Sequence, residues 1–125
     1  GIDAETETRV VDLQGSDHLP WNWMYLDIGP KTAELYAQII GHAKMIFWNG
    51  PLGYVENPQY AKGSKMIADA IAKSHAKSIV GGGDTEAFIR NYKMQKKFDY
   101  ISTGGGAVLE FLAGKEFPVL VYLKK

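Results

Sequence analysis

Three glycine-rich turns, each placed directly after a short apolar segment, constrain the fold of this chain more than any other feature. They are Trp48-Asn49-Gly50-Pro51, Gly81-Gly82-Gly83-Asp84-Thr85 and Thr103-Gly104-Gly105-Gly106-Ala107. The second and third turns are each followed by a helical pattern. At the carboxyl ends of neighbouring parallel strands, such turns direct backbone N–H groups and helix N-termini into one crevice, where a polyphosphate binds. The three turns therefore predict part of a nucleotide site.

Apolar periodicity predicts strands that alternate with helices along almost the whole chain. Short apolar runs predict strands over residues 9–13, 44–48, 78–80, 100–102 and 119–123. Helical spacing of apolar residues predicts helices over residues 30–42, 60–71, 84–92 and 107–113. The sequence contains no internal repeat and no linker. We therefore expect one α/β unit with a mostly parallel sheet of about five strands.

The charge and residue composition argue against several function classes. Fourteen acidic residues balance fourteen basic residues, so the chain has no basic field that would hold a nucleic acid or an anionic membrane. It has no cysteine, which excludes disulfides, thiolate metal sites and cysteine nucleophiles. No apolar run is long enough to cross a bilayer. We expect a cytoplasmic protein without a nucleic-acid or membrane partner.

Two glycine triplets, Gly81–Gly83 and Gly104–Gly106, each lie between an apolar strand and a helix in the predicted order. Successive glycines cost backbone entropy, so a chain retains them where a positive φ or a close backbone approach is required. A pair of such triplets favours phosphate binding over plain tight turns. Neither triplet is followed by the Lys-Ser or Lys-Thr of a P-loop, and neither matches the glycine pattern of dinucleotide-binding folds.

Asp84 has two interpretations. An aspartate that precedes a helix commonly accepts a backbone N–H bond as the N-cap residue, and a single Gly-Asp-Thr favours this role. The carboxylate would also suit a hydrated Mg²⁺ that bridges nucleotide phosphates, because Mg²⁺ prefers one or two carboxylates together with phosphate oxygens. The two roles are compatible, since the cap geometry would aim the carboxylate.

Four motifs resemble the phosphoglycerate kinase family in order and in spacing. They are Trp48-Asn49-Gly50-Pro51-Leu52-Gly53, the Ala61-Lys62-Gly63-Ser64 that follows it, Gly81-Gly82-Gly83-Asp84-Thr85, and Ser102-Thr103-Gly104-Gly105-Gly106-Ala107. The stretch Leu26-Asp27-Ile28-Gly29-Pro30-Lys31-Thr32 resembles the segment that precedes these motifs in the family. The resemblance extends over nearly the whole chain.

The resemblance implies a fold and an activity. The family's nucleotide-binding domain is a Rossmann-like three-layer α/β/α unit in the C-terminal half of a bilobal enzyme, and residues 1–125 resemble the C-terminal part of that domain. Members of the family transfer a phosphoryl group between 1,3-bisphosphoglycerate and Mg·ADP in glycolysis, by positioning and charge neutralisation. The resemblance thus implies a phosphotransferase that binds ADP or ATP together with Mg²⁺.

The resemblance also implies roles for individual residues. By similarity, Asn49 and Pro51 line the nucleotide side of the cleft and Glu56 binds the ribose hydroxyls. Gly82, Gly83, Asp84 and Thr85 resemble the nucleotide phosphate segment, with Asp84 as the Mg²⁺ ligand. Gly83, Gly104, Gly105 and Gly106 resemble the catalytic backbone donors to the transferring phosphoryl group.

The chain does not contain the family's N-terminal substrate lobe or its Gly-Ala-Lys segment. We therefore expect that the isolated chain is inactive and that 3-phosphoglycerate or 1,3-bisphosphoglycerate binds only with the missing lobe. An unpaired strand over residues 119–123 would favour self-association of the chain. The alternative function is a non-catalytic nucleotide-binding or interaction module that has kept the glycine turns.

Overall fold

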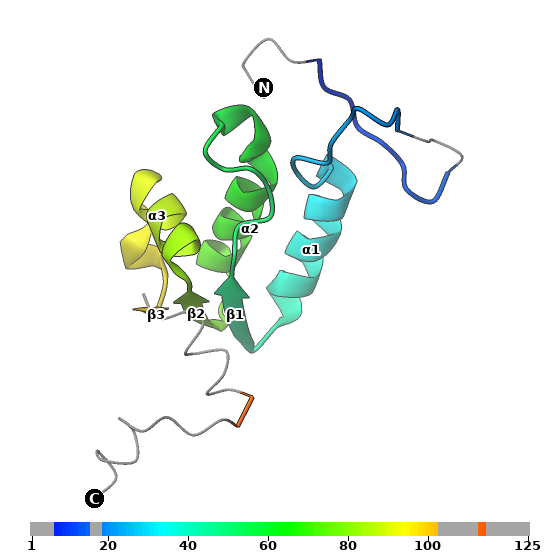
Figure 1. Ribbon diagram of the computed structural model, residues 1–125. Helices are drawn as coiled ribbons and strands as arrows, with labels where there is room; N and C mark the ends of the chain where they lie inside the picture. Colours follow the sequence, from blue (N-terminus) through cyan, green and yellow to red (C-terminus); the bar gives the residue numbers. More distant parts are fainter. Residues whose placement is uncertain (1–6, 16–18, 103–112, 115–125) are drawn as a thin grey trace, which may run out of the picture. The chain divides into compact units, whose positions relative to one another are not determined.

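The fold alternates helices and parallel strands, as the periodicity predicts (Figure 1). A computed structural model describes residues 7–15, 19–102 and 113–114 of the chain. In chain order the elements are α1 (Pro30–His42), β1 (Met45–Asn49), the 3₁₀ turn η1 (Pro58–Tyr60), α2 (Lys62–Lys73), β2 (Lys77–Gly81), α3 (Gly83–Asn91), the 3₁₀ turn η2 (Gln95–Lys97) and β3 (Tyr100–Ser102). The α/β class predicted from the sequence is confirmed.

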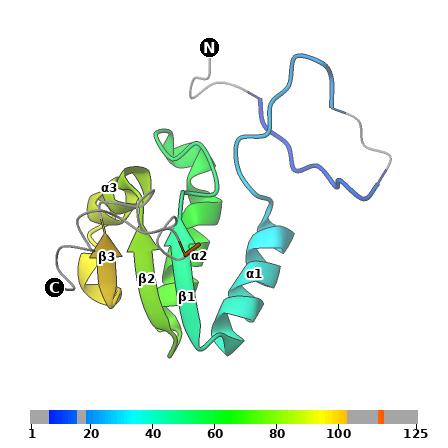
Figure 2. The same ribbon diagram turned by 60° about the horizontal axis from the view of Figure 1, so that its bottom comes forward.

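The strands form one parallel sheet in the order β1-β2-β3, and Figure 2 shows the three arrows side by side with the same direction. Asn49 of β1 pairs with Gly81 of β2, which in turn pairs with Ser102 of β3. These three residues are the last of their strands. The carboxyl ends of the three strands are therefore level, and Gly50 and Gly82 follow two of them at the same edge of the sheet.

The sheet has three strands in the described residues, where the sequence predicted about five in the whole chain. The predicted strand over residues 9–13 is wrong, since this segment has no regular structure and Val10 and Leu13 are largely exposed. The guanidinium of Arg9 instead lies 4.9 Å from the centroid of the Trp23 ring, a cation–π arrangement. The predicted helix over 107–113 and strand over 119–123 lie outside the described residues, apart from Ala113.

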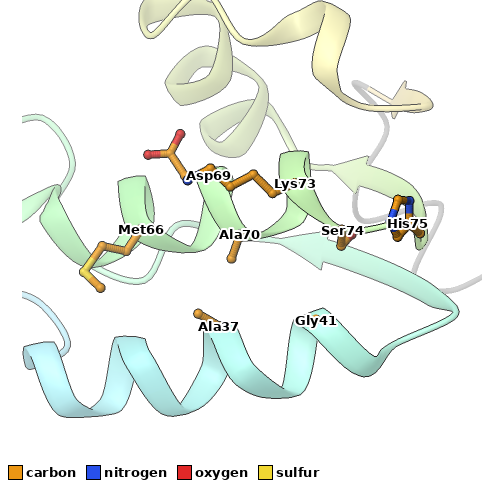
Figure 3. Close-up of a pocket in the computed structure, with 8 residues that line it drawn as sticks. All are labelled: Ala37, Gly41, Met66, Asp69, Ala70, Lys73, Ser74 and His75. Carbon is orange, nitrogen blue, oxygen red and sulfur yellow. The ribbon is translucent and has the colours of Figure 1, made fainter.

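The chain divides into two units, Gly1–Ala43 with Pro51–His75 and Lys44–Gly50 with Ala76–Lys125. In the first unit, α1 begins at Pro30, whose fixed φ suits the first helical position. Helices α1 and α2 lie side by side, and Ala37 and Ala70 point toward one another between them (Figure 3). Helix α2 buries a stripe that includes Ile67 and Ile71.

The second unit has its core where the sheet meets α3. The Trp48 ring meets Phe88 of α3 edge to face at 6.0 Å and meets Phe98 at 6.3 Å. At the opposite end of the sheet from the glycine turns, the Ser78 N–H and hydroxyl both donate to Asp99 Oδ2, at 2.7 and 3.0 Å. These bonds tie the start of β2 to the segment that leads into β3 and lower the pKa of Asp99.

Candidate functional site

Strands β1 and β2 are each followed by a glycine with a left-handed backbone. Gly50 follows β1 with a φ of 92°, and Gly82 follows β2 with a φ of 93°. L-residues other than glycine rarely adopt such values. The two glycines lie next to each other, because Asn49 and Gly81 are paired in the sheet. Gly50 and Gly82, from the first and second predicted glycine turns, thus come together at one edge of the second unit, and the third turn lies outside the described residues.

The peptide groups of Gly50 are held on both sides. Its N–H donates to Thr85 Oγ1 at 2.7 Å, and its carbonyl oxygen accepts from the Trp48 indole Nε1–H at 2.8 Å. Thr85 lies in the first turn of α3 and is completely buried. The bond from Gly50 to Thr85 therefore joins the two glycine turns across 35 residues of sequence.

Gly82 and Gly83 are glycines for different reasons. A Cβ atom on Gly82 would lie 2.9 Å from Asn49 Oδ1 and 3.7 Å from Thr85 Oγ1, in addition to the unfavourable φ. A Cβ atom on Gly83 would meet nothing within 4 Å among the described residues, and Gly83 is an exposed residue in the first helical position. The described part of the chain thus leaves space beside the start of α3, where a ligand could approach the backbone.

Asp84 is not the N-cap residue that the sequence favoured. The helix begins one residue earlier than predicted, the N-cap is Gly82, and no side chain caps the helix. Asp84 is the second helical residue, where a carboxylate interacts favourably with the helix dipole. It is exposed, and no hydrogen bond from its side chain is found among the described residues. The carboxylate is thus available to solvent or a ligand.

The start of α3 also presents free backbone donors. The first bond of the helix runs from the Glu86 N–H to the Gly82 carbonyl oxygen, at 3.0 Å. The amides of Gly83, Asp84 and Thr85 precede it and have no acceptor within the helix. Amides in this position, together with the positive end of the helix dipole, favour the binding of an anion.

The predicted site residues divide between the two units. Asn49 and the segment Gly82–Thr85 are adjacent in the second unit. Pro51 and Glu56 lie in the loop between β1 and η1, which belongs to the first unit, and Glu56 is exposed. The triplet Gly104–Gly106 lies outside the described residues.

The loop that carries Glu56 is fixed by hydrogen bonds to its own backbone. The Leu52 N–H donates to Ser64 Oγ at 2.8 Å, and the Tyr54 N–H donates to the Leu26 carbonyl oxygen at 2.8 Å. Ser64 is completely buried in α2. This loop has no regular structure between β1 and η1, so these bonds set its path.

Asp27 organises the same region, a role that the sequence analysis missed. Its Oδ2 accepts from the Gly63 N–H at 2.8 Å, near the start of α2, and its Oδ1 accepts from the Ile28 N–H at 2.8 Å. A Cβ on Gly53 would lie 2.6 Å from Asp27 Oδ1. Burial raises the pKa of Asp27, and these hydrogen bonds and the nearby Lys62 oppose the rise only in part. The one signal in the sequence was the place of Asp27 in a family-like motif.

Two other kinds of site are not supported. Among residues 7–15, 19–102 and 113–114, no three histidine, cysteine, aspartate or glutamate side chains gather in a way that could hold a metal ion. No helix in the described part has the length and apolar character needed to cross a membrane.

A groove of about 500 Å³ lies between α1 and α2 (Figure 3). Small residues such as Ala37 and Gly41 line it on the α1 side, and Met66 and Lys73 line it on the α2 side. The Asp69 carboxylate at its border is paired with Lys65 at 2.7 Å. The groove contains none of the predicted site residues, and we assign no site to it.

Comparisons with known proteins show the family of the chain. A family model described as phosphoglycerate kinase matches residues 2–115. The phosphoglycerate kinase structure from Coxiella burnetii is 47% identical, with a TM-score of 0.69, over 72% of this chain and 23% of that chain. The phosphoglycerate kinase structure from Pyrococcus horikoshii OT3 is 44% identical, with a TM-score of 0.76, over 82% of this chain and 25% of that chain. The chain spans about a quarter of the length of these structures, and it belongs to the phosphoglycerate kinase family.

Proposed function

We propose that the protein transfers a phosphoryl group between 1,3-bisphosphoglycerate and Mg·ADP. In this proposal, residues 1–125 supply the C-terminal part of the nucleotide-binding domain, and the glycerate substrate binds to a part of the protein outside them. The observation that carries the proposal is the pair of glycine turns, Gly50 and Gly82, at level ends of adjacent parallel strands. This is where α/β folds bind nucleotides.

The start of α3 is the proposed phosphate site. The amides of Gly83, Asp84 and Thr85 would donate to the phosphate oxygens of the nucleotide, and the helix dipole would add a favourable field. The open space beside Gly83 supports this role, because nothing in the described residues explains a glycine in an ordinary helical position. Gly83 and the Gly104–Gly106 amides would act on the transferring phosphoryl group itself.

Asp84 is the proposed contact to the Mg²⁺ that accompanies the nucleotide. Its carboxylate is exposed and makes no capping bond, so it could contact the ion without giving up a hydrogen bond to the helix. Mg²⁺ bound in this way would neutralise phosphate charge.

The family resemblance supports nucleotide contacts by three further residues. Asn49 lies against Gly82 and, with Pro51, would line the nucleotide side of the cleft. Glu56 would bind the ribose hydroxyls from a loop whose path is set by Ser64 and Leu26. Catalysis would rest on positioning and charge neutralisation, without a covalent intermediate on the protein.

A coupled assay on the complete protein tests the proposal. With 1,3-bisphosphoglycerate and Mg·ADP we expect turnover in the ordinary range for kinases, roughly 1–100 per second. The 125-residue chain assayed alone is expected to bind nucleotide weakly and to show no turnover. If the complete protein binds Mg·ADP but transfers no phosphoryl group, the proposal is wrong and a non-catalytic nucleotide-binding module is favoured.

A further inference from the structure

Both polar backbone groups of Gly50, the residue after β1, form hydrogen bonds to side chains. The Trp48 indole holds its carbonyl oxygen and the Thr85 hydroxyl oxygen holds its N–H. We refer to these two hydrogen bonds as the Gly50 clamp. The donor–acceptor distances are short, at 2.8 Å from Trp48 Nε1 to the Gly50 carbonyl oxygen and 2.7 Å from the Gly50 nitrogen to Thr85 Oγ1.

The clamp restricts the backbone of Gly50 and thereby the residue that precedes it. Glycine can adopt many backbone conformations because it has no Cβ atom, and Gly50 has a φ of 92°. Hydrogen bonds to both of its polar groups restrict that freedom. Asn49, the residue before Gly50, is thereby held at the end of β1.

Neither of the clamping side chains is accessible to a ligand. Thr85 is 0% exposed and Trp48 is 7% exposed. Trp48 is further held by the rings of Phe88 and Phe98, so its indole N–H has little freedom to turn away. The Thr85 hydroxyl therefore accepts a hydrogen bond inside the protein. Only the backbone N–H of Thr85 could donate to a ligand at the start of α3.

We propose that Trp48 and Thr85 are positioning residues that hold Asn49 in the orientation required to bind the nucleotide. The inference rests on the proposed function and adds to it two residues that act through Gly50. In this scheme Thr85 links Gly50, at the end of β1, to the phosphate-facing turn after β2. Asn49 and that turn then keep a fixed spacing within the second unit.

The test compares variants of Thr85 in the complete protein. Thr85→Val keeps the shape of the side chain but removes the acceptor, Thr85→Ser keeps the hydroxyl, and Trp48→Phe removes the indole donor. Ile89→Val is the matched control, because Ile89 is fully buried in the same helix and makes no polar contact. Steady-state kinetics give KM for each substrate, and hydrogen exchange reports on the Gly50 amide.

We expect Thr85→Val to raise KM for the nucleotide about tenfold, the effect of leaving one buried N–H without an acceptor. KM for the glycerate substrate should change less than about twofold, and exchange of the Gly50 amide should accelerate at least about tenfold. Trp48→Phe should also raise the nucleotide KM. Thr85→Ser should restore values near the wild type, and Ile89→Val should leave both KM values unchanged.

Two results would overturn the inference. One is a Thr85→Val protein with a wild-type nucleotide KM and a protected Gly50 amide. The other is an equal loss for both substrates that Ile89→Val reproduces, which would mean that Thr85 contributes only stability. A wild-type protein without phosphoryl transfer would refute the proposed function instead, and the exchange rate of the Gly50 amide would still decide whether the hydrogen bond to Thr85 exists.

Discussion

The adjacent residues Gly82 and Gly83 should respond in opposite ways to the same substitution. In Gly82→Ala the new side chain is forced into a backbone with a φ of 93°, which costs about 1–3 kcal/mol. Its Cβ would also lie 2.9 Å from Asn49 Oδ1, but Asn49 is exposed and can move. We therefore expect the free energy of unfolding to fall by about 2 kcal/mol, mostly from the backbone.

Gly83→Ala is the matched control on the next residue. Gly83 has a helical backbone, and a Cβ there would meet nothing within 4 Å. Alanine restricts the unfolded chain and favours the helix, so we expect no loss and a gain of up to about 1 kcal/mol. The two alanine variants should differ by about 2–3 kcal/mol in the free energy of unfolding.

Urea denaturation of the wild type and the two variants measures this difference. The slopes should agree, so that shifts of the midpoint report stability alone. The reasoning fails if Gly82→Ala is as stable as Gly83→Ala, because the positive φ would then carry no strain. Nucleotide titration adds a second readout: Gly83→Ala should weaken binding despite its stability, since the proposed phosphate approaches the chain there.

Three further substitutions test the interactions that hold each unit. Asp27→Asn should lower the free energy of unfolding by about 1–2 kcal/mol, because the single amide oxygen cannot replace both carboxylate oxygens that accept from the Gly63 and Ile28 N–H groups. In the wild type the pKa of Asp27 is raised, so its contribution to the free energy of unfolding is lost as pH rises through the folded-state pKa. The variant should not show this pH dependence. Asp99 has a lowered pKa, so its contribution to the free energy of unfolding is present above the unfolded-state pKa of about 3.9 and is lost as pH falls through the folded-state pKa. In Asp99→Asn, denaturation curves at a series of pH values should no longer show this loss of stability at acidic pH. Tyr60→Phe should raise the free energy of unfolding by up to about 1 kcal/mol, since the Tyr60 hydroxyl is buried without a partner in the described part of the chain; a destabilised Tyr60→Phe protein in thermal or urea unfolding would show that the hydroxyl is satisfied.

Local patterns were sufficient to predict most of the secondary structure. The helix over 30–42 has the predicted bounds, and the strands at 45–49, 77–81 and 100–102 lie within one residue of theirs. Continuous apolar runs and glycine punctuation carry this information, because they act between near neighbours in the chain. The strand prediction for residues 9–13 was wrong because a strand also needs a neighbouring strand to pair with, and β propensity does not predict that pairing.

The sequence predicted which residues lie at the ends of β1 and β2, but not the hydrogen bonds between them. The glycine turns located the edge of the sheet, yet the sequence did not show that Gly82 rather than Asp84 occupies the N-cap position. The choice of the N-cap residue depends on the φ angle of Gly82, which is 93°. The bonds of Thr85 to Gly50 and of Asp27 to Gly63 join residues about 35 positions apart, and a spacing of that size has no periodic signature.

The Mg²⁺ dependence of nucleotide binding in Asp84→Asn tests the central claim most directly. Because Asp84 makes no capping bond, the substitution removes a charge without disturbing the fold. Calorimetric titration with ADP should show that the wild type binds more tightly with Mg²⁺, that Asp84→Asn loses about tenfold in affinity with Mg²⁺, and that the two proteins bind alike without it. Equal affinities of the two proteins for Mg·ADP would contradict a metal-nucleotide site at the start of α3.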